Sequence, residues 1–347
     1  MATKETILVT GANGSLGSAI AAQVASKAEL SAYHGLYTVR DAGHAPALNA
    51  ALAQGSTTHA YGILSLDLTK LDNVRNVAKE INRRVSTGEI PPIRAIVLNA
   101  GYQDFGNKSR TEDGLDSVFV ANYLGHWLLT LLLLGSMDKE AGRIVVIGSQ
   151  SHDPNDPRNA ATHAFDDPRY KTVISDAAGF NAVARGEWSP AAEDVGFVGG
   201  FRRYGASKLF LVMMQHELQQ RLTSDPGLSR ICVLGVDPGA MPTGIVRLAS
   251  FFIRVVVFQV ILPLMLFLGL GGDMVRAPSR SAGDVLEAAF GAVGEGGELP
   301  RDLYFDGRKP FETAEESRDA RKRAIVWGES VKLAGLREGD TVLEKWR

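Results

Sequence analysis

The sequence predicts a doubly wound α/β fold, in which a seven-stranded, mostly parallel sheet carries helices on both faces. Two observations predict it. Short apolar runs alternate with longer amphipathic stretches, which is typical of parallel strands joined by crossover helices, and a glycine-rich turn follows the first apolar run. The chain has 347 residues with 45% hydrophobic content, which suits one large core or two modest ones. We expect one domain over residues 1–347, carrying insertions.

The first strand is expected at residues 6–10, and the five residues before it leave no room for a cleavable signal peptide. Further strand candidates are the apolar runs at residues 36–40, 62–67, 93–99, 143–147, 231–236 and 302–305. Helical periodicity is found over residues 16–27, 72–84, 115–134, 204–222 and 282–290.

Three segments interrupt this alternation. Residues 150–203 are rich in Asp, Pro, Asn and Gly, and predict an enlarged insertion with short helices over the active site, because long loops in compact domains are usually functional. Residues 244–281 form an apolar substrate-loop region, within which residues 251–270 are interrupted by Arg254, Gln259 and Pro263. Residues 311–347 predict a C-terminal helical extension whose charged helix is most simply a solvated face.

Composition argues against several function classes. The net charge is −2, from 37 basic and 39 acidic side chains, and no basic run could neutralise a nucleic-acid backbone. Cys232 is the only cysteine, so an intrachain disulfide is impossible and a reducing compartment is permitted. The seven histidines show no metal-ligand spacing, so we expect no metal site.

The strongest binding motif is the turn Thr-Gly-Ala-Asn-Gly-Ser-Leu-Gly at residues 10–17. It lies between a strand and a helix, where glycines let backbone N–H groups approach a pyrophosphate, although an ordinary tight turn would also favour glycine. Residues 67–69 and 98–101 follow two later strands. Each could be a plain turn, but together with the glycine-rich turn they would line one crevice at the carboxyl ends of the strands.

The catalytic candidates are a phenol, an ammonium group and a hydroxyl. Tyr204 and Lys208 are four residues apart and share one helix face, and a nearby cation is expected to move the phenol pKa toward neutrality, where a general acid works best. An ordinary helix start is the alternative. Ser149 ends a strand where a substrate carbonyl would lie, and it lacks the context of a nucleophile elbow.

These motifs, in this order, resemble the short-chain dehydrogenase/reductase family, with finer likeness to its retinol-dehydrogenase-like and fungal or plant reductase branches. The resemblance implies a Rossmann fold and assigns Tyr204 as general acid/base, Ser149 as carbonyl anchor, Lys208 as ribose ligand and activator of the tyrosine, and Asn122 as holder of a relay water. Asn122 by itself could equally serve local hydrogen bonds. The cofactor-binding residues implied are Gly11, Asn13, Ser15, Leu16, Gly17, Arg40, Asp67, Leu68, Asn99, Ala100, Gly101, Tyr204, Lys208, Pro238, Gly239, Met241 and Thr243.

The sequence departs from the family pattern in two places. Ser15 occupies the position of the second glycine, which predicts a slightly altered phosphate turn that still binds. The segment between Ser149 and Tyr204 is much longer than the family's usual dozen or so residues, so the substrate class cannot be carried over from relatives.

We therefore expect an NADP-dependent oxidoreductase that transfers a hydride between nicotinamide and a carbonyl or secondary alcohol of a lipophilic small molecule. Arg40 favours NADP over NAD because it offers a guanidinium where NAD enzymes usually carry a carboxylate, although Asp41 beside it weakens this interpretation. The alternative function is a catalytically weak nucleotide-binding regulator that kept the fold.

Expected partners follow from the apolar stretches. Apolar residues in the segment 115–134 and in the Tyr204 helix predict a homodimer or tetramer paired through these helices, or else deep burial within one subunit. We expect a cytoplasmic protein. Residues 251–270 form either an apolar lid over the substrate or a peripheral contact with a membrane surface, but not a membrane span.

Overall fold

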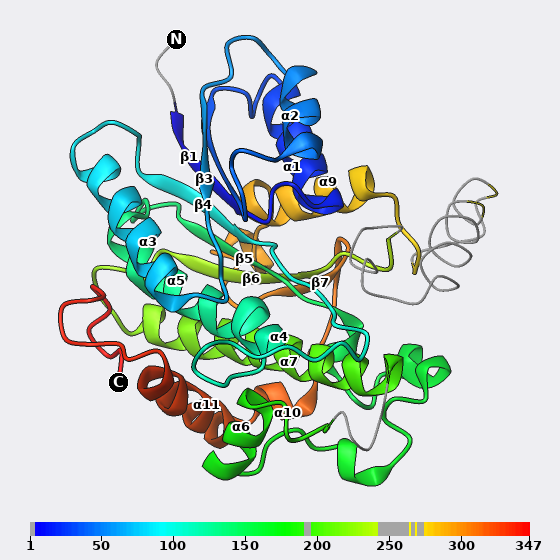
Figure 1. Cartoon of the computed structure of the whole chain (residues 1–347). Coiled ribbons are helices and arrows are strands. Elements are labelled where there is room, and N and C mark those ends of the chain that lie inside the picture. Colours follow the sequence, from blue (N-terminus) through cyan, green and yellow to red (C-terminus); the bar gives the residue numbers. More distant parts are fainter. Residues whose placement is uncertain (1–3, 191–195, 242–263, 265–267, 269–273) are drawn as a thin grey trace.

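A single sheet organises the protein (Figure 1). The computed structural model describes residues 4–190, 196–241, 264, 268 and 274–347. The sheet has eight strands in the order β3-β2-β1-β4-β5-β6-β7-β8. Their bounds are β1 Lys4–Thr10, β2 Tyr33–Val39, β3 Tyr61–Ser65, β4 Ile93–Leu98, β5 Arg143–Ile147, β6 Cys232–Asp237, β7 Tyr304–Asp306 and β8 Lys309–Pro310. The predicted doubly wound α/β fold is confirmed.

The sheet differs from the prediction at one edge. The strands from β3 to β7 pair in parallel, whereas β8 pairs antiparallel with β7 through Phe305–Pro310 and Asp306–Lys309. The predicted count of seven strands was therefore one too low. A two-residue strand is too short to produce a periodic pattern in the sequence.

Helices cover both faces of the sheet (Figure 1). Alternation along β1 sends Ile7 and Val9 into one apolar core and Leu8 into the other. The first core is closed by α1 Ser15–Ser26, α2 Pro46–Ala53 and α9 Pro278–Phe290. The second is closed by α3 Leu71–Ser86, α5 Gly125–Leu133, α6 Ala177–Ala184, α7 Phe197–Thr223 and α11 Ala320–Leu333.

The segment predicted as one helix over 115–134 has a more varied backbone. It runs through α4 Ser117–Phe119, a π-helical turn at Val120–Leu124, α5 and a 3-10 turn at Leu134–Ser136. Among the described residues, Ser117–Ser136 is the one helical stretch long and apolar enough to cross a membrane, and 89% of its most apolar window is buried inside the protein. Its apolarity is therefore that of a core segment.

The insertion and the C-terminal extension pack together. Described parts of the insertion form the 3-10 helices η3 Gln150–His152, η4 Pro157–Thr162 and η5 Pro168–Tyr170, together with α6, and α7 begins at Phe197 rather than at Tyr204. In the extension, α10 spans Glu315–Arg318. The Glu316 carboxylate accepts the backbone N–H groups of Val173 and Ile174, which joins extension and insertion.

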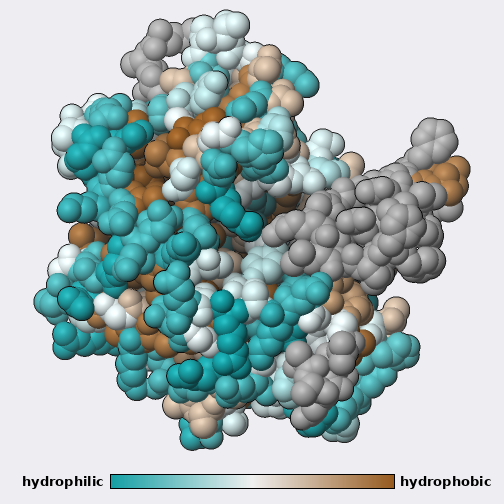
Figure 2. All heavy atoms as spheres, viewed as in Figure 1, coloured by the Kyte–Doolittle hydropathy of each residue, from teal (hydrophilic) through white to brown (hydrophobic). Residues whose placement is uncertain are grey.

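The predicted solvated helix of the extension has one buried side. In α11, Val326, Trp327 and Ser330 are buried, and the Trp327 ring packs edge-on against Trp127 of α5 at 5.3 Å between centroids. Viewed as in Figure 1, the outer surface of this helix layer is mainly hydrophilic (Figure 2). Burial within one chain therefore accounts for the apolar residues of α5 and α7. The homodimer or tetramer remains a prediction, and the apolar residues of these two helices no longer support it.

Three sequence predictions fall on the apolar region after β6. Thr243, the segment 251–270 except for Leu264 and Leu268, and most of the region 244–281 lie outside the described residues.

Candidate active site

A cleft of about 760 Å³ opens at the carboxyl ends of the strands. It is lined by Ser149, Tyr204 and Lys208 and by the described residues predicted to bind cofactor, namely Gly11, Asn13, Ser15, Leu16, Gly17, Arg40, Asp67, Leu68, Asn99, Ala100, Gly101, Pro238, Gly239 and Met241. Asn122 is fully buried beside the cleft, whose wall includes its neighbour Ala121. The structure therefore brings together the residues that the sequence singled out separately.

The glycine-rich turn has the geometry of a phosphate cradle. Gly11 has φ +65°, and a Cβ there would lie 2.8 Å from the Ala100 Cα, while a Cβ on Gly17 would lie 2.4 Å from the Gly11 carbonyl oxygen. Gly14 caps α1 without a side-chain hydrogen bond, so the first N–H groups of the helix are not covered by a capping side chain. Ser15 begins the helix and lines the cleft. These features fit the pyrophosphate of a dinucleotide.

The side chain of Asn13 caps a neighbouring helix of the same chain. Its Oδ1 accepts the N–H groups of Ala47 and Leu48 at 2.9 and 3.2 Å, and so caps α2, a helix that the sequence analysis did not predict. The cap fixes the segment after β2, where Arg40, Asp41 and His44 line the cleft. Arg40 is exposed and lies just past the end of β2.

The environment of Tyr204 corrects one expectation. Tyr204 is 9% exposed, and burial raises its pKa, against a smaller lowering by the Ser149 side chain. The Lys208 Nζ lies 5.6 Å from the Tyr204 ring centroid and donates to the Ile147 carbonyl oxygen at 2.8 Å. The expected shift of the phenol toward neutrality was therefore wrong for the protein alone. Burial exceeds any effect of the cation, and the same burial lowers the Lys208 pKa to about 8.

Asn122 lies in the π-helical turn. Its Oδ1 accepts the Tyr102 N–H and its Nδ2 donates to the Tyr102 carbonyl oxygen and to the Ser207 Oγ, each at 3.0 Å. The amide thereby joins the backbone of Tyr102, which follows β4, to α7. π-turns inside α-helices are frequent at functional sites.

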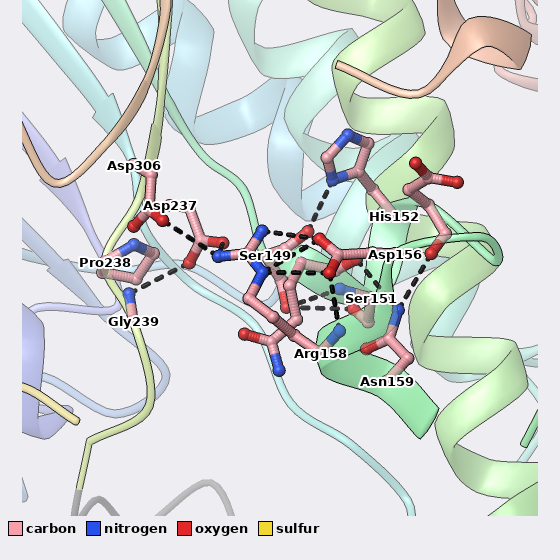
Figure 3. Close-up of polar contacts among 12 residues, drawn as sticks. Ser149, Ser151, His152, Asp156, Arg158, Asn159, Asp237, Pro238, Gly239 and Asp306 are labelled. Atoms are coloured by element: carbon pink, nitrogen blue, oxygen red, sulfur yellow. Dashed lines mark hydrogen bonds and ion pairs between the residues drawn. The ribbon is translucent and has the colours of Figure 1, made fainter. Parts of the chain in front are cut away.

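The structure adds Asp237 and Arg158, which the sequence analysis did not select (Figure 3). Asp237 ends β6, directly before Pro238, and its Oδ1 accepts the Gly239 N–H at 2.9 Å. Arg158 comes from η4, and its Nη1 lies 3.5 Å from the Asp237 Oδ2. An acidic residue at a strand end within a cofactor motif was the available signal for Asp237. No local pattern marks Arg158, because its partners are distant in the sequence.

His152 is a second residue that was missed. Its Nδ1 lies 2.6 Å from the Ser149 carbonyl oxygen, and its Nε2 accepts the Ala314 N–H at 3.1 Å (Figure 3 shows the first contact). Burial lowers the pKa of His152, which favours the neutral ring with its proton on Nδ1. The histidine thus fixes the backbone of Ser149 against the C-terminal extension.

Comparison with known proteins agrees with this geometry. The short chain dehydrogenase family model matches residues 5–161. The short-chain dehydrogenase iccH of Talaromyces variabilis is 39% identical over 361 residues, covering 98% of each chain. The chloroplastic protochlorophyllide reductase of Daucus carota is 27% identical, covering 96% of this chain and 79% of the relative.

Among solved structures, the angucycline C-6 ketoreductase LanV with bound NADP superposes with a TM-score of 0.55 at 19% identity, covering 87% of this chain and 93% of that one. This likeness shows the fold. The identity with the Talaromyces variabilis protein along nearly the whole of both chains shows the family. The chain belongs to the short-chain dehydrogenase/reductase family and is an NAD(P)-dependent oxidoreductase.

Proposed function

We propose that the protein reduces the carbonyl group of a lipophilic small molecule with NADPH, and that Tyr204 supplies the proton. One observation carries the proposal: Tyr204 and Ser149 line the wall of one cleft, which also contains Lys208 and the glycine-rich cradle. A substrate oxygen placed at this pair would meet two hydroxyl donors.

The chain's own groups have separate tasks in this reaction. NADPH, when bound, supplies the hydride. Ser149 donates a hydrogen bond that polarises the substrate oxygen, and Tyr204 transfers its proton to that oxygen as negative charge develops. Lys208 lies on the same helix face with a pKa near 8, so it titrates close to working pH and stabilises the phenolate that remains. The Asn122 amide joins this helix to the backbone of Tyr102 in the cleft wall.

The preference for NADP rests on Arg40. Its exposed guanidinium borders the cleft, and the adjacent Asp41 carboxylate already accepts the Gly43 N–H at 2.9 Å. Asp41 is thus engaged in a local turn, which leaves Arg40 as the charged group suited to a 2′-phosphate.

The lipophilic substrate class rests on the apolar sequence at 251–270, which begins ten residues after Met241 of the cleft. Whether this segment acts as a lid or contacts a membrane can be tested by liposome flotation of the wild type and of a variant with Phe251, Phe252 and Phe258 changed to Ser. Binding that disappears in the variant supports membrane contact. No flotation of either protein, with poorer use of bulky apolar ketones by the variant, supports the lid.

The experiment that tests the function is NADPH oxidation by the purified protein with a broad panel of ketones and aldehydes. Turnover with apolar carbonyl compounds supports the proposal. NADPH binding without turnover across the panel would favour the nucleotide-binding regulator instead.

A further inference from the structure

The insertion places a cation, Arg158, beside Asp237 and Asp306 (Figure 3). The guanidinium of Arg158 reaches the ends of β6 and β7, where its Nη1 lies 3.0 Å from the Asp306 Oδ2 and 3.5 Å from the Asp237 Oδ2. Its Nη2 contacts the Asp156 Oδ2 at 2.6 Å. The Arg158 side chain is 19% exposed and is not part of the cleft wall. One residue of the insertion therefore joins two neighbouring strands of the sheet.

Asp237 connects this cation to the cleft. Its side chain is 3% exposed, and its Oδ1 accepts the N–H of Gly239, so the carboxylate fixes the Pro238–Gly239 turn that lines the cleft. Its Oδ2 has no hydrogen bond within the described part of the chain, and the ion pair found for it there is with Arg158. An ionised carboxylate at this depth is costly unless it is paired.

Several other titratable groups face Asp237. They are Asp306 and Tyr304 on β7, His152 on η3, and Tyr204 and Lys208 on α7. Arg276 donates to the backbone oxygen of Asp237 at 2.9 Å, and its Nη2 pairs with Asp306. The negative charge of Asp237 raises the pKa of both Tyr204 and Lys208.

We propose that Arg158 is a positioning residue for the reaction: by pairing with Asp237 it holds the Pro238–Gly239 turn in place and maintains a negative charge beside Tyr204 and Lys208. This inference rests on the proposed function, because the turn and the two side chains are its cofactor and proton-transfer elements. Arg158 acts through Asp237 and touches neither substrate nor cofactor.

The consequence of losing Arg158 follows from the burial of its partner. Burial already raises the pKa of Asp237, and Arg158 opposes that shift. Without the cation, Asp237 takes up a proton. Its hydrogen bond to the Gly239 N–H then weakens, and the anion that raises the pKa of Tyr204 and Lys208 is gone. The pH dependence of the reaction should therefore move to lower pH.

The test compares Arg158→Met, Arg158→Lys and Asp237→Asn with the control Arg169→Met, which removes an arginine paired with Asp167 on the exposed part of the same insertion. NADPH affinity is measured by calorimetry, and kcat/KM is followed against pH. For Arg158→Met we expect weaker NADPH binding and a loss in kcat/KM of roughly ten- to a hundredfold, as for a misplaced reacting group. Its pH profile should shift to lower pH, as in Asp237→Asn. Arg158→Lys should recover part of the loss, and the control should match the wild type.

A double variant separates positioning from a general structural role. If Arg158 acts through Asp237, adding Arg158→Met to Asp237→Asn should cost less than about twofold further. The inference would be overturned if Arg158→Met lowered kcat/KM as much in the Asp237→Asn background as in the wild type. It would also be overturned if the pH profile of Arg158→Met were unshifted or shifted to higher pH. Should Arg158→Met fail to fold, Arg158→Lys and Asp237→Asn carry the same test. If the wild type turns over no carbonyl compound, the proposed function fails, whereas NADPH affinities equal to the control would refute only the role of Arg158.

Discussion

Replacing Tyr204 with phenylalanine should separate proton transfer from cofactor binding. The change removes one oxygen atom from a residue that lines the cleft together with Ser149. The buried ring keeps its packing, and Lys208 keeps its 2.8 Å hydrogen bond to the Ile147 oxygen, because that bond does not involve the phenol. We therefore expect the fold and the NADPH affinity of Tyr204→Phe to match those of the wild type.

The rate should respond very differently. A positioned general acid contributes about 10²–10⁴ in rate, or about 3–5 kcal/mol of barrier at 1.36 kcal/mol for each factor of ten. Burial raises the pKa of Tyr204, so the wild-type phenol is a proton donor throughout the neutral range, and Phe cannot replace it at any pH. We expect kcat to fall at least about a hundredfold.

The assay is NADPH oxidation followed by absorbance, together with NADPH binding followed by fluorescence. The matched control is Tyr123→Phe, which removes the same atom from a buried phenol that bonds the Ser330 hydroxyl at 2.7 Å outside the cleft wall. That variant should lose about 1 kcal/mol of unfolding free energy and keep its turnover. If Tyr204→Phe retained more than about a tenth of wild-type turnover, the role assigned to Tyr204 would be refuted.

Four further predictions test cofactor choice, buried charge and the C-terminal extension. Arg40→Ala should weaken NADPH binding about tenfold more than NADH binding, because a charge-assisted contact to phosphate is lost, and equal losses by calorimetry would reopen NAD as the cofactor. Asp104→Ala removes the buried carboxylate that lies 2.8 Å from the Arg203 Nη2, so denaturant titration should show a loss of about 3–5 kcal/mol, and a loss under about 1 kcal/mol would contradict the buried pair. Burial lowers the Lys208 pKa from 10.5 to about 8, so between these values the unfolded chain binds more protons than the folded one, and wild-type stability should rise with pH. Lys208→Met carries no buried amine, so the difference between its Tm and the wild-type Tm should shrink over this pH range, and a constant difference would argue against the pKa shift. Trp327→Ala should cost about 3–5 kcal/mol and increase self-association in light scattering, because it uncovers α5, whereas an unchanged Tm would show that α11 does not cover this face.

The sequence predicted the parts of the fold whose signal is local. The apolar run of β1, the glycine-rich turn and the Tyr204–Lys208 spacing each lie within a few residues, so their periodicity or residue types are visible directly. The π-turn around Asn122 was not predictable, because π and α turns share the same apolar composition. Helix α2 was missed because its cap, Asn13, comes from a distant turn rather than from the helix's own N-cap residue.

The features of the site that the sequence did not predict depend on tertiary contacts. A Tyr-x-x-x-Lys spacing gives the face that two side chains share, but it does not give the depth at which they are buried, and burial decided the direction of the Tyr204 pKa shift. The ion pair between Arg158 and Asp237 joins residues far apart in the chain, and no pattern within either segment specifies the other. Such pairs become visible only when the sheet brings its strand ends together.

The contacts between insertion and extension limit how this chain can be recombined with its relatives. Exchanging only the insertion for a short family loop would remove the N–H groups of Val173 and Ile174 from the Glu316 carboxylate. It would also remove Arg158 and so leave the Phe311 ring without its stacking partner. Exchanging only the extension would leave the His152 ring without the Ala314 N–H. A functional chimera should therefore transfer both segments at once, as one exchangeable unit drawn from two distant stretches of sequence.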